Sequence, residues 1–273
     1  MRVFVLGHRG MLGHVVAAHL VDRGIEVLTS DRRYEGVPRD PLVEEVRASG
    51  AAWVVNAIGR IKQKCRDLAE LVLANGRLPV HLAARLAPCQ RLLHASTDCV
   101  FAGDRGGYRT TDERDAGDEY GFSKILGEAA AAAGRCQVLR VSIVGPELSG
   151  GHGLLGWFFR QAGPVNGFTN HAWNGITTLE WAKRAHEVIA GTWEPPGPLV
   201  QLASAGRVSK GELLRVTADV WGLPTEVRAV AAPDPVDRTL VGDVECPPIR
   251  DQLAELCTWH QLRFGPLAAG GAR

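Results

Sequence analysis

The chain has no apolar run near the roughly 20 residues that a membrane-spanning helix requires. It also has no surplus of one charge, because 31 lysines and arginines are balanced by 30 aspartates and glutamates. Nucleic-acid-binding proteins usually carry a basic stripe, so nucleic acid is not expected as a partner. A strand-like run follows Met1-Arg2 directly, and no signal peptide is predicted. We therefore expect a cytoplasmic protein without membrane contact.

Cysteine pairs with metal-ligand spacing are also missing. The six cysteines form no C-x-x-C pair and no ligand-spaced cluster with histidine. Reduced thiols in a cytosolic protein are the expected state, and no metal site is predicted. With 45% hydrophobic and 22% charged residues, the composition is that of an ordinary globular enzyme. Its 273 residues suffice for one large domain or for a core domain with a smaller appendage.

The first 31 residues have the pattern of a nucleotide-binding unit. Residues 2–6 and 26–29 are typical of buried strands, and residues 14–23 have apolar side chains at helical spacing. Between the first strand and the helix lies Gly7-His-Arg-Gly10-Met-Leu-Gly13. Glycines let the backbone approach a pyrophosphate, which N–H groups at the helix start can bind. A purely structural glycine turn is the alternative. The pattern predicts cofactor contacts from Gly7, Arg9, Gly10, Met11 and Leu12.

The end of the second strand bears on the choice of cofactor. Asp31 lies 18 residues after Gly13, where a carboxylate can accept a hydrogen bond from the adenosine ribose and favours NAD. Arg32 follows it, and a guanidinium there can hold a 2′-phosphate and favours NADP. A solvated loop charge is the alternative for Arg32. A carboxylate and a guanidinium are both present, so we expect NADP(H) or NAD(H) as the cofactor, with NADPH slightly favoured.

The third predicted strand, residues 52–55, ends in Asn56-Ala57-Ile58-Gly59. Open α/β sheets bind ligands at the carboxyl ends of their strands, and small residues there let a cofactor lie against the backbone. We therefore predict cofactor contacts from Asn56, Ala57 and Gly59, and from Asn75 in the helix expected over residues 67–86. The basic residues Arg60, Lys62 and Lys64 either face substrate phosphates or form an exposed turn.

Strands and helices alternate up to residue 145, which predicts a Rossmann-type, doubly wound parallel sheet with helices on both faces. The remaining elements of this part are helices at 41–49 and 118–133 and strands at 90–95 and 137–141. After residue 145 the regular alternation of strands and helices ends. Short helices and strands are expected at 154–161, 165–173, 178–190, 199–202, 209–221 and 226–230, within an otherwise irregular 222–273. We expect a dinucleotide-binding domain at 1–145 and a smaller interleaved substrate lobe at 146–273, with residues 179–203 packing back onto the first domain.

The stretch from Leu93 to Glu128 has the residues of a proton-donating site. Ser96-Thr97-Asp98 ends the fourth strand, and Tyr120 and Lys124 stand four residues apart, on one face of a helix. Carbonyl reduction needs a hydride at carbon, which a nicotinamide supplies, and a proton at oxygen. A nearby ammonium is expected to lower the pKa of the tyrosine, which is ordinarily about 10. Thr97, or Ser96 beside it, can fix the carbonyl oxygen against the phenol. A Tyr-x-x-x-Lys pair alone is commonly a surface pair. Such a pair together with the glycine turn after the first strand is much rarer, and the combination favours a catalytic role.

These motifs together resemble the extended short-chain dehydrogenase/reductase superfamily, and most closely its dTDP-4-dehydrorhamnose reductase group. The resemblance rests on Gly10-Met-Leu-Gly13, Ser96-Thr97-Asp98 and Tyr120-Gly-x-Ser-Lys124. It implies NAD(P)H-dependent reduction of a 4-keto deoxysugar nucleotide, with Thr97, Tyr120 and Lys124 as catalytic residues. It also implies cofactor contacts from Ser96, Tyr120 and Lys124. The substrate contacts that it implies are Thr97, Asp98, Val100, Tyr120, Trp173 and Arg238.

Two other functions fit the same pattern. One is a nucleotide-sugar epimerase that retains NAD while it oxidises and re-reduces one position. The other is a non-catalytic dinucleotide-binding protein, since fold alone does not fix function. The intact set of Thr97, Tyr120 and Lys124 favours an enzyme, and a nucleotide-linked sugar is the expected partner. A homodimer is an open expectation.

Overall fold

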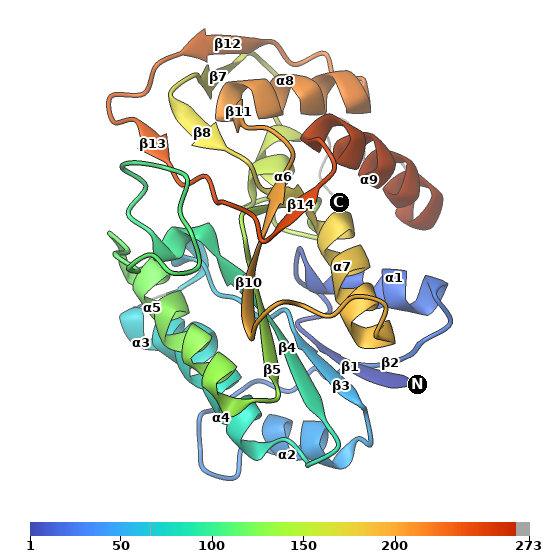
Figure 1. The fold of residues 1–273 in the computed structure, drawn as a ribbon. Helices are drawn as coiled ribbons and strands as arrows, with labels where there is room; N and C mark the ends of the chain where they lie inside the picture. The colour runs from blue at the N-terminus through green and yellow to red at the C-terminus, as the bar shows by residue number, and fades with distance from the viewer. Residues whose placement is uncertain (66, 266–273) are drawn as a thin grey trace.

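One central sheet organises the protein (Figure 1). The computed structural model describes residues 1–65 and 67–265. Seven strands lie in the order β14-β10-β5-β4-β3-β1-β2, and neighbours run parallel. They are β1 (Arg2–Leu6), β2 (Glu26–Leu28), β3 (Trp53–Asn56), β4 (Arg91–Thr97), β5 (Cys136–Val141), β10 (Leu199–Ser204) and β14 (Val244–Cys246). This confirms the predicted Rossmann-type parallel sheet.

Helices cover both faces of the sheet (Figure 1). On β1, Val3 and Val5 pack toward α1 (Gly13–Asp22) and α7 (Thr178–Ala190), whereas Phe4 and Leu6 pack toward α2 (Pro41–Ala48) and α4 (Leu78–Arg85). Because side chains alternate along a strand and both faces are covered, the strand is a nearly continuous apolar run. The core therefore consists of two apolar layers, one on each side of the sheet.

The segment between β3 and β4 differs in detail from the predicted helix over 67–86. A 3-10 turn, η1 (Lys62–Lys64), precedes it, and α3 (Leu68–Leu71) and α4 are joined by a π-helical turn, η2 (Val72–Arg77). The irregular turn precedes Pro79, and a new α-helix begins at Leu78, as expected from a proline at which a helix kinks or restarts. Pro79 lies in the first turn of α4, where its missing N–H costs no hydrogen bond. The π turn instead places Asn75 in the interior.

The chain after β5 forms smaller elements beside the carboxyl ends of the main strands. In three small sheets, β8 pairs with β11 and β13, β12 pairs with β7, and β6 pairs with β9. Helix α8 packs on two of these sheets. The bounds are β6 (Ile143–Val144), α6 (Leu154–Phe158), β7 (Val165–Phe168), β8 (His171–Trp173), β9 (Ile176–Thr177), β11 (Val208–Ser209), α8 (Lys210–Trp221), β12 (Val227–Val230) and β13 (Val236–Asp237).

The expectation of irregular structure over residues 222–273 is wrong for residues 222–265, and its last eight residues lie outside the described part of the chain. Strand β14 extends the main sheet, and α9 (Ile249–Phe264) is a helix of 16 residues. Its start has no side-chain cap, and its buried face includes Gln252, which bonds the Thr177 N–H and the Pro247 carbonyl oxygen. A buried amide interrupts the apolar periodicity that predicts a helix. Among the described residues no helix is both long enough and apolar enough to span a membrane.

Two buried histidines predict that the protein loses stability in acid. Burial lowers the pKa of His19 to about 4, helped by the charge of Arg23, and burial also lowers the pKa of His260 to about 4. Within the described part of the chain, His19 Nε2 and His260 Nδ1 have no hydrogen-bond partner. Unfolding restores the ordinary pKa, so the folded state loses stability as the pH falls from about 6.5 toward 4, by about 2 kcal/mol per histidine.

Urea unfolding at pH 7, 6 and 5 measures this loss. The double substitution His19→Gln and His260→Gln should flatten the dependence, whereas the exposed His152→Gln should leave it as in the wild type. Equal slopes for wild type and double variant would show that other groups control acid unfolding.

Candidate active site

The carboxyl end of β4 and the first turns of α5 (Glu119–Glu128) bring together the three predicted catalytic residues. The Thr97 Oγ1 accepts from the Cys99 N–H at 3.2 Å and thereby starts a 3-10 turn, η3 (Asp98–Val100). Asp118 caps α5, because its Oδ1 accepts from the Gly121 N–H at 2.7 Å. The threonine hydroxyl and the first turns of α5 therefore meet at one edge of the sheet.

The close approach of α5 depends on its glycines. A Cβ at Gly121 would collide with the Cys99 carbonyl oxygen, and a Cβ at Gly127 would collide with the Asn75 carbonyl oxygen. With both backbones this close, the Tyr120 phenol is hydrogen-bonded to the Thr97 side chain. Lys124 is buried and donates from Nζ to the Ala95 carbonyl oxygen at 2.7 Å. This explains why the tyrosine and lysine are separated by a motif that contains glycine.

The prediction that an ammonium lowers the pKa of Tyr120 is wrong for this structure. Burial raises that pKa above its ordinary value of 10.0, and the negative charge of a Cys99 thiolate would raise it further. The Thr97 hydrogen bond acts in the opposite direction but is outweighed. The physical reason is that a phenolate loses its hydration in this half-buried position. Tyr120 is therefore fully protonated at neutral pH, which is the form that an acid requires.

The pKa of Lys124 is shifted in the opposite direction, below its ordinary value. Burial lowers the pKa of its ammonium to about 8, against the raising effect of the Glu128 carboxylate. At neutral pH most of the side chain is still charged, and it loses that charge as the pH rises through about 8. A positive charge thus lies one helical turn from the phenol at neutral pH.

Behind the site lies a buried ionic network that the sequence did not predict. Glu128 Oε1 accepts from Ser96 Oγ at 2.7 Å, and its two oxygens accept from the Arg140 guanidinium at 2.8 and 2.7 Å. Burial raises the pKa of Glu128, but the hydrogen bonds and charge of Arg140 outweigh it and leave it lowered. The hydroxyl of Ser96, predicted to contact the cofactor, is thereby held inside the protein.

The glycine turn has the close packing that a nucleotide cradle needs. Gly7 has a φ of +78° and lies against the backbone of Ala57 and Ile58. A Cβ atom at Gly7 would lie only 3.0 Å from backbone atoms of both residues. A side chain at Gly13 would collide with the Gly7 carbonyl oxygen. The N–H of Gly10 donates to that oxygen at 2.8 Å, and Leu12 precedes the first residue of α1. The turn thus presents bare backbone at the start of a helix.

The charged residues at the end of β2 are paired across the surface. Arg9 Nη2 lies 2.7 Å from Asp31 Oδ2, and His8 Nε2 lies 3.5 Å from Asp31 Oδ1. Arg32 Nε lies 3.1 Å from Glu45 Oε2. All these groups except His8 are more than one-third exposed, so the pairs are weak and a ligand can replace them.

Asn56 and Asn75, both predicted to contact the cofactor, are buried and bonded to protein. Asn56 accepts from the Ile58 N–H at 3.2 Å. The Asn75 Oδ1 accepts from the Arg60 N–H at 2.8 Å, and its Nδ2 donates to the Arg60 carbonyl at 2.9 Å and to Ser123 Oγ at 2.9 Å. Both amides hold the loop after β3, in which Ala57 and Gly59 leave the backbone accessible.

The predicted substrate residues Asp98, Trp173 and Arg238 gather beside Thr97. Asp98 Oδ1 accepts from Thr97 Oγ1 at 3.1 Å, and the Asp98 side chain also bonds Ser142. The indole of Trp173 donates to Ser142 Oγ at 2.8 Å. Arg238 donates to the carbonyl oxygens of residues 101 and 102, both at 2.9 Å. A connected chain of polar side chains therefore leads from the phenol of Tyr120 into the second half of the protein.

Val100, predicted to contact the substrate, lies in the interior of the protein. Its side chain has no exposed surface and packs with Phe101, Tyr108 and Leu240 in a separate apolar cluster. The Val100 side chain therefore faces the protein interior, and its predicted substrate contact stays a prediction. The apolar character of that position serves packing, which the sequence pattern could not distinguish from binding.

Sequence reasoning missed Ser142 and Lys210 as members of the site. Lys210 Nζ lies 5.2 Å from the centroid of the Trp173 ring, and its charge acts on Asp98. The position of Lys210 directly after the helix cap Ser209 was the available signal, because a lysine is disfavoured in the first turn of a helix. Within the described ranges, no three metal-ligating side chains lie together.

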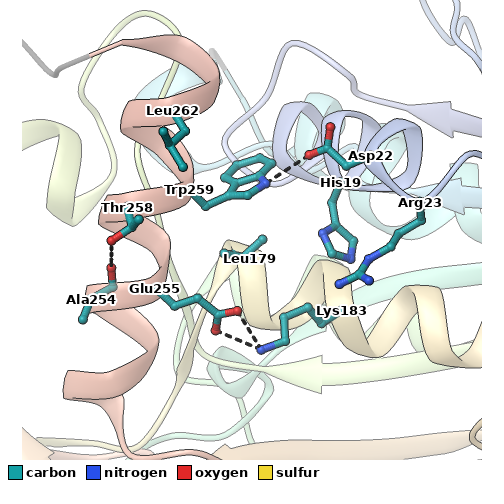
Figure 2. Close-up of a pocket in the computed structure, with 10 residues that line it drawn as sticks. All are labelled: His19, Asp22, Arg23, Leu179, Lys183, Ala254, Glu255, Thr258, Trp259 and Leu262. Atoms are coloured by element: carbon teal, nitrogen blue, oxygen red, sulfur yellow. Dashed lines mark hydrogen bonds and ion pairs between the residues drawn. The ribbon is translucent and has the colours of Figure 1, made fainter.

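A hollow on another part of the surface lies between α1, α7 and α9 (Figure 2). Figure 2 shows Asp22 bonded to Trp259 and Lys183 bonded to Glu255 across it. This hollow belongs to the α1 and α7 side of the sheet, whereas Tyr120 and Lys124 come from α5, which packs against α4 and η2. It is therefore separate from the candidate active site.

Comparison with known families assigns residues 1–175 to the family described as "RmlD substrate binding domain". A curated relative, the dTDP-4-dehydrorhamnose reductase of Mycobacterium tuberculosis, is 31% identical over 140 residues. That alignment covers 48% of this chain and 46% of the relative, so the chain spans about half the length of the curated relatives it matches.

Solved structures of low sequence identity share the fold. A dTDP-4-dehydrorhamnose reductase from Clostridium acetobutylicum superposes with a TM-score of 0.79 at 18% identity, covering 96% of this chain and 100% of that one. The dTDP-4-dehydrorhamnose reductase of Bacillus anthracis, solved in complex with NADP, superposes with a TM-score of 0.77 at 16% identity, covering 93% and 98%. The fold therefore extends well beyond the residues that the family match covers.

Proposed function

The chain belongs to the RmlD substrate binding domain family, and from this premise we propose that it is an NAD(P)H-dependent reductase of a 4-keto deoxysugar nucleotide. The observation that carries the proposal is the Tyr120 phenol, hydrogen-bonded to Thr97 one helical turn from the buried ammonium of Lys124. Relatives named dTDP-4-dehydrorhamnose reductase support the same substrate class. The proposal includes action in the cytoplasm, a homodimer, a dinucleotide-binding domain at 1–145 and a substrate lobe at 146–273.

The glycine turn and the loop after β3 fit a dinucleotide. Bare backbone at Gly7, Gly10 and Gly13 leaves the start of α1 open to a diphosphate, and Asp31 or Arg32 would meet the adenosine ribose. Lys124 and Tyr120 would face the other end of the cofactor. When bound, a reduced nicotinamide supplies the hydride for the carbonyl carbon.

The residues of the chain supply position and a proton. With substrate bound, Thr97 would turn its single hydroxyl proton from Asp98 to the substrate oxygen and hold that oxygen beside the phenol, and Tyr120 donates its proton to the same oxygen. The ammonium of Lys124, one helical turn away, would attract the phenolate that remains, but burial dominates and keeps the pKa of Tyr120 raised. Before substrate binds, Asp98 fixes Thr97 through the 3.1 Å hydrogen bond and so keeps its hydroxyl at the end of β4.

A panel of nucleotide-linked 4-keto sugars, each offered with NADPH and with NADH, tests the proposal. We expect loss of nicotinamide absorbance with one class of substrate and a new hydroxyl in the product sugar. Purified protein that already contains tightly bound NAD, and that interconverts two hydroxyl epimers without net consumption of cofactor, would show an epimerase instead. Absence of turnover across the panel together with unchanged dinucleotide affinity would favour a non-catalytic protein.

Replacing Arg32 with alanine should weaken NADPH binding about tenfold and change NADH binding by less than about twofold, because only NADPH carries a 2′-phosphate for the guanidinium. The exposed ion pair between Arg32 and Glu45 is weak enough for the guanidinium to leave it. Fluorescence titration with each nucleotide measures both constants, with Arg33→Ala as the matched control. Equal weakening of both nucleotides by Arg32→Ala would contradict a role in reading the phosphate.

A further inference from the structure

Lys210 occupies the substrate side of the site, although it belongs to an element far along the chain. Strand β11 pairs with β8, with Val208 opposite Trp173 and Ser209 opposite Ala172. The chain then turns into α8, whose first residue is Lys210. Its Nζ lies 5.2 Å from the centroid of the Trp173 ring, and its charge acts on Asp98. Lys210 is thus beside the residue that holds the catalytic Thr97.

The surroundings of Lys210 disfavour a positive charge in three ways. The start of α8 is the positive end of the helix dipole. Burial lowers the pKa of the ammonium, and the nearby guanidinium of Arg238 lowers it as well. Asp98 and Cys99 act in the opposite direction, and Asp98 is itself destabilised as an anion by burial. A lysine in this position is therefore poorly explained by the stability of the fold.

The ammonium of Lys210 also has unused hydrogen-bonding capacity. Among residues 1–65 and 67–265, the structure records its contact with the Trp173 ring and no hydrogen bond from Nζ. Arg238, by contrast, donates two N–H groups to backbone carbonyl oxygens of the loop after η3. The cluster therefore combines two cations with one carboxylate, and one of the cations has three donors to offer. An anionic oxygen group satisfies both the donors and the charge.

We propose that Lys210 is a substrate-binding residue that donates hydrogen bonds to an anionic oxygen group of the substrate, over the face of Trp173 and next to Asp98. This inference rests on the proposed function, because a nucleotide-linked sugar brings such a group to the site. Its source is either the diphosphate or a carboxylate on the sugar, and both present the same oxygen chemistry to an ammonium.

Binding measurements on the NADP⁺ complex separate the two sources. The ligands are thymidine, dTDP, dTDP-glucose and dTDP-glucuronate, titrated by calorimetry into wild type and Lys210→Met. If the diphosphate is the partner, the substitution weakens dTDP about tenfold or more and leaves thymidine unchanged. If a carboxylate is the partner, dTDP is unaffected, and the tighter binding of dTDP-glucuronate over dTDP-glucose is lost. Lys210→Arg should keep the affinity in either case, because the charge and donors remain.

Matched variants distinguish binding from a structural role. Lys183→Met removes a lysine on α7 at the separate hollow of Figure 2 and should leave all four affinities unchanged. Should Lys210→Met fold poorly by circular dichroism, Lys210→Gln is measured in its place. Affinities equal to wild type in a folded Lys210 variant overturn the inference and leave the proposed function standing. If the wild type binds none of the thymidine ligands, the titrations are repeated with the uridine and guanosine counterparts, and wild-type protein that binds none of these either overturns both.

Discussion

Replacing Tyr120 with phenylalanine should lower kcat about a thousandfold, because a positioned general acid contributes on the order of 10²–10⁴ to the rate. The substitution removes the hydroxyl that donates the proton to the carbonyl oxygen and keeps the aromatic ring. The hydrogen bond with Thr97 is lost, but Thr97 keeps its bonds to Asp98 and to the backbone of η3. The threonine should therefore still position the substrate.

Single-turnover reduction and nucleotide titration measure the two effects separately. The dissociation constant of NADPH should change by less than about twofold in Tyr120→Phe, since the cofactor is held mainly by the glycine turn and β2. Tyr34→Phe is the matched control: Tyr34 also has a hydrogen-bonded phenol, at 2.9 Å from His81, but lies in the apolar layer that contains α2 and α4. A Tyr120→Phe enzyme that keeps a tenth of the wild-type rate would exclude the phenol as the acid.

The sheet, and the gathering of Thr97, Tyr120 and Lys124 at one edge of it, were predictable because local sequence determines them. The apolar run Arg2–Leu6, the glycines that follow it and the spacing of Tyr120 and Lys124 each have an alternative interpretation, but together they fit one arrangement in a parallel sheet. The carboxyl ends of such strands meet at one edge, so residues distant in sequence are brought together without knowledge of any contact. The family match over residues 1–175 confirms the resemblance that these motifs indicated.

The remaining parts of the site depend on contacts that local sequence does not encode. Ser96 looked available to a ligand, but its register opposite Arg140 in the β4–β5 pair lets Glu128 bond both side chains. Lys210 reaches the site only because β11 pairs with β8. The raised pKa of Tyr120 follows from burial, which spacing along a helix cannot reveal.

The Glu128–Arg140 pair should be the most sensitive point of the fold outside the apolar layers. Its two side chains are 0% and 1% exposed, and Arg140 also donates to Gln201 Oε1 at 2.8 Å. Removing one partner of a buried pair leaves an uncompensated charge and costs on the order of 3–5 kcal/mol. Replacing both partners by apolar residues removes the charge altogether, so the double variant should be more stable than the single one.

Glu128→Gln should therefore lower the free energy of unfolding by about 3 kcal/mol or more, and Glu128→Leu with Arg140→Met should recover part of that loss. Urea unfolding followed by tryptophan fluorescence gives both values. The control is Asp219→Asn, which breaks an ion pair with Arg250 whose side chains are 63% and 57% exposed and should cost less than about 1 kcal/mol. A loss of that small size in Glu128→Gln would mean that water hydrates the Arg140 guanidinium and compensates for the missing carboxylate.

Glu128→Gln should also change the pH dependence of the reaction, an effect that a purely structural change would not have. The Glu128 carboxylate raises the pKa of Lys124, which burial lowers to about 8. Without that carboxylate the ammonium should lose its proton at a lower pH, so the alkaline limb of the rate profile should shift toward neutrality in folded Glu128→Gln. Rates measured between pH 6 and 9, at a temperature where circular dichroism shows native protein, test this. An unshifted limb would mean that Lys124 does not set the alkaline dependence, because the carboxylate acts on no other group of the catalytic set with comparable proximity.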